Sequence, residues 1–272
     1  MKGLSISIVT YAPDLSVLAE TLFRLQQALI HARYRGRLIG AHLTLVDNGP
    51  GPDWHDRLTT LLKTREWPAS VELLSGHGNI GYGAGHNRAL HQSHLEFHLI
   101  LNPDVWLEED ALSEGLAFLT AHPEAGLLTP AARNDHGQRL YLCKRYPGML
   151  DLALRGFAPS WLKRQFHNRL DHYEWRDQTG ETVSWDPPLV SGCFMLCRRK
   201  ALLDAGDFDE TYFLYFEDFD LSRRLARHTR LVYTPTVRIV HLGGDTARKG
   251  LRHIGLFLRS AIRFFNQHGW QW

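Results

Sequence analysis

The chain has little cysteine, with 3 residues among 272. So few cysteines, and an odd number of them, argue against a disulfide framework and fit a reducing compartment. No apolar run approaches the ~20 residues that cross a bilayer. Met1-Lys2-Gly3-Leu4 leads directly into a strand pattern, without the features of a signal peptide. We therefore expect a cytoplasmic protein that could also bind peripherally at the inner face of the cell membrane.

The chain also lacks a strong excess of charge, since 31 Lys and Arg against 29 Asp and Glu give a formal net charge of +2. This balance argues against nucleic acid as a partner. The sequence contains no internal repeat, low-complexity tract or flexible linker. Its 44% apolar and 22% charged residues are ordinary for a globular protein.

The first half of the chain alternates strand-like and helix-like segments. Short apolar runs predict strands, and leucines spaced three or four residues apart predict helices. The predicted strands are Leu4–Val9, Leu43–Val46, Val71–Leu74, Phe97–Leu101 and Gly126–Thr129, and the predicted helices are Leu15–Leu29, Asn87–His94 and Leu112–Leu119. The alternation indicates an α/β fold with a parallel sheet covered on both faces. Ligands of such sheets bind at the carboxyl ends of the strands, which here carry Thr10, Asp47, Gly76 and Asn102.

The second half begins with a segment that loses this rhythm. Cys143–Asp186 is rich in Trp, Tyr, Arg and His, and we interpret it as an irregular or helical insertion over the sheet. It either packs as a connection or forms a lid that contacts a substrate. A strand is predicted over Val190–Cys197 and a short helix from Arg199. Cys193 and Cys197 could form a metal pair, but a buried strand is the preferred interpretation because no second pair exists.

Two acidic turns are the main candidates for chemistry. Asp104 follows the strand that ends at Leu101, where a carboxylate can bind Mg²⁺ or Mn²⁺ under a diphosphate. Glu217 and Asp218 begin an apparent helix among aromatic residues, a setting that can raise a carboxylate pKa and favour a general base. Each turn also has a structural interpretation. Asn-Pro-Asp is a common turn, and acids such as Asp220 stabilise the first turn of a helix.

Three further motifs are weaker when taken singly. The glycine-rich run Gly78–Asn87 could bring backbone amides close to an anion or could be a tight turn before a helix. Asp47 could accept the N3–H of uracil or thymine, framed by Thr10 and Tyr11, or could cap a helix. His241 closes a predicted strand, Val237–Val240, and is either a metal ligand or a packing residue.

The order of these pieces resembles that of family 2 glycosyltransferases, most closely their rhamnosyltransferase-like branch. The resemblance spans nearly the whole chain. The matching segments are Thr10-Tyr11, Asp47-Asn48, Asn79–Asn87, Leu101–Asp104, Val190–Phe194, Gly206–Glu210, Phe213–Leu221 and His241. It implies the GT-A fold, a single domain over about residues 1–245 with a Rossmann-like, mostly parallel sheet and helices on both faces. A nucleotide half of about residues 1–130 would precede an acceptor half of about residues 131–245.

The resemblance also implies roles for individual residues. Asp218 would be the catalytic base, Glu217 would orient the acceptor or the base, and Asp104 and His241 would hold Mg²⁺ or Mn²⁺. The residues expected to bind the nucleotide and donor are Thr10, Tyr11, Asp47, Asn79, Gly81, Asn87, Asn102 and Gly192. Asn102 departs from the pattern, since many relatives carry an aspartate there.

The function that follows is an inverting, metal-dependent transferase for bacterial surface polysaccharide assembly. It would move a sugar from a nucleoside-diphosphate donor, with dTDP-L-rhamnose favoured, to a glycan or polyprenyl-linked saccharide. The alternatives are a UDP-hexose-dependent transferase of the same fold and a non-catalytic nucleotide- or carbohydrate-binding module.

The last segment, residues 246–272, contains no acidic residue and is predicted to form a basic amphipathic helix. Its apolar face would be Leu251, Ile254, Leu258, Ala261, Ile262 and Phe265, with Arg252, Arg259 and Arg263 opposite, and the segment also contains the basic residues Arg248 and Lys249. Such a helix either docks on an anionic membrane surface or packs its apolar face on the domain.

Overall fold

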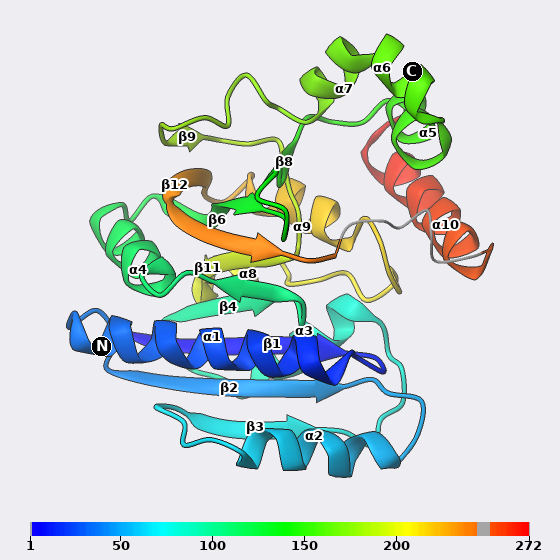
Figure 1. Ribbon diagram of the computed structural model, residues 1–272. Helices are drawn as coiled ribbons and strands as arrows, with labels where there is room; N and C mark the ends of the chain where they lie inside the picture. Colours follow the sequence, from blue (N-terminus) through cyan, green and yellow to red (C-terminus); the bar gives the residue numbers. More distant parts are fainter. Residues whose placement is uncertain (1, 244–250, 272) are drawn as a thin grey trace.

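The computed structural model describes residues 2–243 and 251–271. Across these residues a mixed sheet runs in the order β3-β2-β1-β4-β11-β6-β12-β5, with β7 paired to β6 and β9 to β12 (Figure 1). A small separate sheet pairs β10 with β8. The strands are β1 (Gly3–Thr10), β2 (Gly40–Asp47), β3 (Ser70–Leu74), β4 (Phe97–Leu101), β5 (Val105–Leu107), β6 (Ala125–Arg133), β7 (Arg139–Leu140), β8 (Cys143–Lys144), β9 (Ser184–Trp185), β10 (Leu189–Val190), β11 (Phe194–Arg198) and β12 (Arg230–His241).

The first four long strands pair in parallel, which confirms the fold class predicted from the alternating segments. β1 pairs with β2 and β4, and β2 pairs with β3. The second half departs from a purely parallel sheet, because β11 lies antiparallel between β4 and β6. The single strand predicted over Val190–Cys197 is also wrong in detail. It is broken at Ser191-Gly192-Cys193 into β10 and β11, which belong to different sheets.

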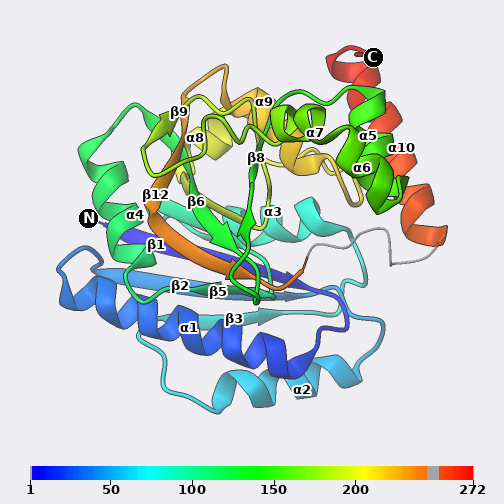
Figure 2. The ribbon, with the colours of Figure 1, turned by 45° about the horizontal axis from the view of Figure 1, so that its top comes forward.

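Helices cover both faces of the sheet (Figures 1 and 2). Alternate residues of a strand point to opposite faces, and the two apolar cores follow this rule. Leu4, Ile6 and Ile8 of β1 pack with leucines of α1, α2 and α4, whereas Val9 packs on α3. The other face carries α8 and α9 as well. These helices are α1 (Leu15–Tyr34), α2 (Asp53–Lys63), α3 (Tyr82–Gln92), α4 (Ala111–Ala121), α8 (Arg199–Asp204) and α9 (Glu217–Leu225).

The helix predicted over Asn87–His94 begins five residues earlier in the structure, at Tyr82. Glycines weaken the sequence signal for a helix, but here they permit close packing. A Cβ on Gly83 would lie 2.8 Å from Phe208, and a Cβ on Gly85 would lie 2.8 Å from Val9. Gly81 precedes the helix with φ of 97°, which disfavours other residues.

The insertion Cys143–Asp186 combines short helices with loops, and its helices lie together with the last helix at one end of the molecule (Figure 2). It contains α5 (Met149–Phe157), α6 (Ser160–Gln165) and α7 (His167–Tyr173), and α10 (Leu251–His268) packs beside α5 and α9. No helix in the described ranges has the length and apolar character needed to span a membrane.

The amphipathic prediction for the last helix is partly correct. Ala261, Phe264 and Phe265 of α10 are buried against residues of α5 and α9. Two members of the predicted apolar face, Leu258 and Ile262, instead remain 48% and 51% exposed. The predicted residues 246–250, including Arg248 and Lys249, lie outside the described residues.

Asp220 does more than stabilise the first turn of a helix. Its carboxylate is fully buried and accepts hydrogen bonds from Arg224, Gln267 and His268. Because Gln267 and His268 belong to α10, this buried carboxylate ties the last helix to α9. A carboxylate without such partners would be costly to bury.

Candidate active site

The carboxyl ends of β1 and β2 form one side of the site. Thr10 lies opposite Asp47 in the parallel register, and both side chains are buried. Asp47 accepts a hydrogen bond from the Gly49 backbone N–H, whereas Asn48 donates to the carbonyl of Gly81. The two strand ends are therefore linked to the glycine-rich loop before α3. A donor role for Thr10, Asp47 and Gly81 remains a prediction that this arrangement permits.

The other predicted donor-side residues differ in their accessibility. Tyr11 is 51% exposed and so is open to a ligand. Asn79 is exposed, and its Oδ1 accepts from the Gly81 N–H at 3.1 Å. Asn87 is buried, and its amide both donates to the Phe208 carbonyl and accepts from the Phe208 N–H. In the structure Asn87 holds the chain around Phe208 in place, which would support a donor site indirectly.

The acidic turn after β4 meets the end of β12. The imidazole Nε2 of His241 lies 3.5 Å from Oδ1 of Asp104. Burial alone would lower the pKa of His241, but the neighbouring Cys193 sulfur and the Asp104 carboxylate raise it to about 10. A Cβ on Gly243 would fall 2.1 Å from Oδ2 of Asp104, so no larger residue fits this close to the carboxylate without a shift.

A search of residues 2–243 and 251–271 finds no group of three or more His, Cys, Asp or Glu side chains placed to hold a metal. Asp104 can supply one oxygen, and His241 can supply one nitrogen once its imidazole releases its proton, as metal binding requires. Mg²⁺ sites often use one or two protein carboxylates and take their other ligands from water and substrate phosphates. The pair therefore fits a metal that is bound together with a diphosphate. Cys193 and Cys197 are both buried free thiols in or next to β11, which favours the core interpretation of that pair.

The second acidic turn begins α9 and comes close to the break between β10 and β11. Asp218 Oδ2 accepts from the Gly192 N–H at 2.8 Å, and Oδ1 accepts from the Phe219 N–H at 2.9 Å. Despite these bonds, burial raises the pKa of Asp218 to about 6. A Cβ on Gly192 would lie 3.1 Å from the Asp218 Cβ, so only glycine leaves this approach open without a shift.

Glu217 precedes the base candidate and lies deeper. Its side chain is 95% buried, with 5% of its surface exposed, and its Oε2 has no hydrogen-bond partner among the described residues. Burial, and then the neighbouring Asp218, raise the pKa of Glu217 well above its usual range. The two residues before it, Tyr215 and Phe216, have φ of 72° and 66°. Such left-handed conformations are costly for aromatic residues and concentrate at functional sites.

Tyr82, to which the motifs assigned no role, connects the two acidic turns. Its hydroxyl lies 2.9 Å from Oδ1 of Asn102 and 2.7 Å from the carbonyl oxygen of Gly192. Burial first, and then the charges of Glu217, Asp218 and Asp104 among others, raise the pKa of Tyr82 far above normal. Tyr82 therefore stays protonated as a donor, and both acidic turns lie within electrostatic reach of its hydroxyl. Its position in a glycine-rich run without helical periodicity hides this role in the sequence.

Replacing Tyr82 with Phe is expected to lower kcat about five- to tenfold, because a lost hydrogen bond costs ~1 kcal/mol and 1.4 kcal/mol is about tenfold in rate. Without the Tyr82 hydroxyl, the backbone at Gly192 would be held less firmly and Asp218, which bonds to it, would be misplaced. Donor binding, measured by calorimetry, should therefore change less than kcat. Tyr34→Phe is the matched control, since Tyr34 is 86% exposed at the end of α1. Equal kcat values for Tyr82→Phe and the wild type would remove this positioning role.

The chain is similar in sequence to curated rhamnosyltransferases. It is 27% identical over 218 residues to the N-acetylglucosaminyl-diphospho-decaprenol L-rhamnosyltransferase of Mycobacterium tuberculosis H37Rv, and the match covers 75% of this chain and 69% of that protein. It is 26% identical over 185 residues to the rhamnosyltransferase WbbL of Escherichia coli K12, covering 64% of each. No protein-family model matches the chain.

Solved structures of glycosyltransferases share the fold. GalNAc-T7 with UDP, GalNAc and Mn²⁺ superposes with a TM-score of 0.63 at 13% identity, over 97% of this chain and 47% of that one. The mannosyltransferase PcManGT of Pyrobaculum calidifontis, in complex with GDP-Man and Mn²⁺, gives a TM-score of 0.60 at 16% identity, over 96% and 64%. At these identities the likeness shows the fold alone, which is the GT-A fold, and this chain spans about half the length of GalNAc-T7.

Proposed function

We propose that this chain, which has the GT-A fold and is similar to rhamnosyltransferases, is an inverting glycosyltransferase. It moves L-rhamnose from dTDP-rhamnose to a hydroxyl of a lipid-linked saccharide. The observation that carries the proposal is the setting of Asp218, a partly buried carboxylate with a raised pKa. It lies one hydrogen bond from Gly192, which Tyr82 joins to the turn that contains Asp104. The similar mycobacterial protein is named for an N-acetylglucosaminyl-diphospho-decaprenol acceptor, and we adopt this class of acceptor.

The reaction is a single displacement. The acceptor hydroxyl loses its proton to a carboxylate oxygen of Asp218 as its oxygen bonds to the anomeric carbon. The bond between that carbon and the diphosphate oxygen breaks on the opposite side, and the nucleoside diphosphate leaves with the electron pair. The anomeric configuration is therefore inverted. Burial, and then the charge of Asp218, raise the pKa of the neighbouring Glu217 well above its usual range, so the pair favours a single negative charge, which Asp218 carries as the base.

Asp104 and His241 are the residues that would hold Mn²⁺ or Mg²⁺. When bound, the ion neutralises charge on the departing diphosphate. Thr10, Tyr11 and Asp47 at the ends of β1 and β2 bind the pyrimidine, and Asp47 accepts its N3–H. Asn79 and Gly81 lie on the neighbouring loop, and Asn102 faces the same edge with an amide suited to a ribose hydroxyl.

A panel of nucleotide sugars tests the proposal. Thermal stabilisation with Mn²⁺ or Mg²⁺ is measured for dTDP-rhamnose, UDP-glucose, UDP-galactose and GDP-mannose, because a ligand that binds only the folded state raises Tm. Transfer to N-acetylglucosamine joined through a diphosphate to a short prenyl chain is then followed by mass spectrometry. We expect dTDP-rhamnose to stabilise most and to give product. If only a UDP-hexose gives product, the donor is that UDP-hexose and not dTDP-rhamnose. If nucleotide sugars bind but none gives product, the chain is a non-catalytic binding module.

We also propose that α10 brings the enzyme to the inner face of the membrane, where lipid-linked acceptors would be found. The exposed Leu258 and Ile262 share the helix with the exposed Arg252, Arg259 and Arg263, and no acid lies between Arg252 and the end of the chain. Apolar side chains together with basic ones suit the headgroup region of an anionic bilayer. The remaining apolar side of α10 packs on the domain, so one helix serves both contacts.

Flotation with vesicles tests this contact. The double variant Leu258→Gln/Ile262→Gln is expected to lose most of its binding to vesicles that contain phosphatidylglycerol, without loss of folding, because both side chains are about half exposed. Truncation is unsuitable because it removes the buried Phe264 and Phe265. Ile39→Gln is the matched control, since Ile39 is 66% exposed before β2. Equal flotation of the double variant and the wild type would exclude α10 as the docking element.

A further inference from the structure

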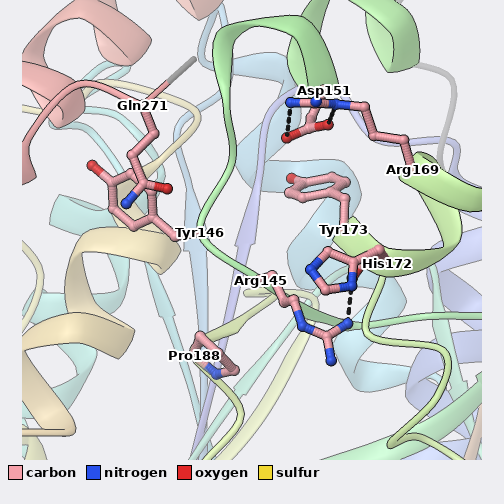
Figure 3. A pocket seen from close by; sticks show the side chains of 8 residues that line it. All are labelled: Arg145, Tyr146, Asp151, Arg169, His172, Tyr173, Pro188 and Gln271. Carbon is pink, nitrogen blue, oxygen red and sulfur yellow. Dashed lines mark hydrogen bonds and ion pairs between the residues drawn. The ribbon is translucent and has the colours of Figure 1, made fainter.

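A cavity of about 460 Å³ lies in the acceptor half, between the insertion helices and the end of the chain (Figure 3). None of the motifs in the sequence points to it. Its lining combines basic, aromatic and polar side chains: Arg145, Tyr146, Asp151, Arg169, His172, Tyr173, Pro188 and Gln271. The residues come from the segment around β8, from α5 and α7, from the approach to β10 and from the residues after α10.

The two arginines of the cavity are held in fixed orientations. Arg169 Nε lies 2.5 Å from Oδ1 of Asp151, whose other oxygen accepts from the Gly148 N–H. Arg145 forms two parallel bonds to Asp177, of 2.8 and 2.7 Å, and a third to the carbonyl of His172. Figure 3 shows these two guanidinium groups on either side of the Tyr173 ring. A guanidinium that is already oriented loses less entropy on binding an anion.

The insertion that contains the cavity is close to neutral overall. Residues 143–186 carry seven Lys or Arg against six Asp or Glu, so the positive charge offered to a ligand is that of individual guanidinium groups. Beside the cavity, the Arg223 guanidinium lies 5.0 Å from the centre of the Tyr146 ring, and its buried Nε has no hydrogen-bond partner among the described residues. This charge favours an anionic ligand, and planar guanidinium groups suit phosphate oxygens. The two tyrosine rings add apolar surface of the kind that sugar rings contact.

The cavity also adjoins α9, the helix that begins at the proposed base. Arg223 of α9 lies over the ring of Tyr146, which lines the cavity. Pro188 also lines it and comes just before β10, whose Val190 N–H donates to Ser222 of α9. A sugar whose hydroxyl meets Asp218 could therefore extend its anomeric substituent toward Arg145 and Arg169.

We propose that this cavity binds the phosphate groups through which the acceptor saccharide is attached to its carrier. The proposal rests on the proposed function, since it names the part of the acceptor that the enzyme recognises. Arg145 and Arg169 contact the phosphate oxygens, and the tyrosine rings contact the sugar. The enzyme thus recognises its acceptor as a sugar diphosphate in this cavity, and it binds the donor at a different place, the ends of β1 and β2.

Steady-state kinetics with two acceptors test the proposal. One is N-acetylglucosamine joined through a diphosphate to a short prenyl chain, and the other is octyl N-acetylglucosaminide, which has no phosphate. Arg145→Gln and Arg169→Gln are each expected to raise KM for the diphosphate acceptor at least tenfold. They should leave kcat/KM for the octyl glycoside within twofold, and the donor affinity unchanged by calorimetry. Arg24→Gln is the matched control, because Arg24 on α1 also pairs with a carboxylate, that of Glu20.

A direct binding experiment separates this inference from the proposed function. Calorimetric titration of the diphosphate acceptor, and of inorganic pyrophosphate alone, does not require turnover. Both should bind the wild type, and both should bind the two variants at least tenfold more weakly. Unchanged affinity in the variants would overturn the inference, whether or not the enzyme transfers sugar. Equal losses for the octyl glycoside and the diphosphate acceptor would also overturn it, because the cavity would then recognise the sugar.

Discussion

Replacement of Asp218 with Asn lowers kcat by about 10³-fold, since a positioned general base contributes ~10² to 10⁴ in rate. The affinity for the nucleoside diphosphate should stay within about twofold, because the Asp218 carboxylate is hydrogen-bonded to Gly192 and Phe219 rather than to the strand ends that are proposed to bind the nucleotide. Single-turnover rates and calorimetry on the same preparation measure the two effects.

The control for this variant must separate chemistry from folding. The Gly192 and Phe219 N–H groups both point at the carboxylate, so the amide of Asn loses one acceptor and costs ~1 to 3 kcal/mol locally. Nucleotide binding and Tm report whether the site survives. Asp204→Asn on α8 supplies the matched substitution at an ion pair with Lys200, away from the site. Full turnover by Asp218→Asn would remove Asp218 from the role of base.

The wild-type rate should follow the ionisation of the same group. Burial raises the pKa of Asp218 to about 6, and only the ionised form accepts a proton. The rate should therefore fall as the pH drops below about 6 and level off above it. The same shift affects stability, because the pKa of Asp218 is higher in the folded state than in the unfolded state. The contribution of Asp218 to the free energy of unfolding is fully present only below the unfolded-state pKa, and it is lost as the pH rises through 6.

Replacement of Asp104 with Ala weakens binding of dTDP in the presence of Mn²⁺ by at least ~10- to 100-fold, the range seen for residues that support a metal. The reason is that the variant leaves His241 as the sole protein ligand of the proposed pair. Calorimetry with Mn²⁺ and with EDTA measures the effect, and the difference between the two conditions should largely vanish in the variant.

Asp110→Ala is the comparison for Asp104→Ala. Asp110 is a surface carboxylate that pairs with Arg238 near the start of α4, and its loss should not change nucleotide affinity. If Asp104→Ala binds dTDP with wild-type affinity when Mn²⁺ is present, Asp104 does not hold the metal.

The sequence predicts the long strands of the first half of the fold well because β1 and β4 are fully buried and β2 is largely so. The prediction of a strand over Phe97–Leu101 has the bounds that the structure shows, since four apolar residues and one histidine between polar residues leave few alternatives. The direction of a strand is not encoded in such a run, so the antiparallel setting of β11 could not be predicted. The break at Gly192 is equally hidden, because the apolar residues on both sides of it read as one continuous strand.

The part of the candidate site that could be predicted is the part that has a local sequence pattern. Asp104 and Asp218 stand out because their settings can be seen locally, the end of a predicted strand for Asp104 and a cluster of aromatic residues for Asp218. Asp220 looked like a helix-capping acid because its partners, Gln267 and His268, lie 47 and 48 residues away in the chain. The cavity beside Tyr173 depends on the packing of α5 and α7 against the end of the chain, and no local pattern reports such contacts.

The anomeric configuration of the product tests the central claim most directly. If Asp218 deprotonates the acceptor in a single displacement, dTDP-β-L-rhamnose yields an α-linked rhamnoside, which NMR identifies from the coupling of the anomeric carbon to its proton. A β-linked product would mean that configuration is retained, which requires two displacements or attack from the leaving-group side, and it would contradict the account.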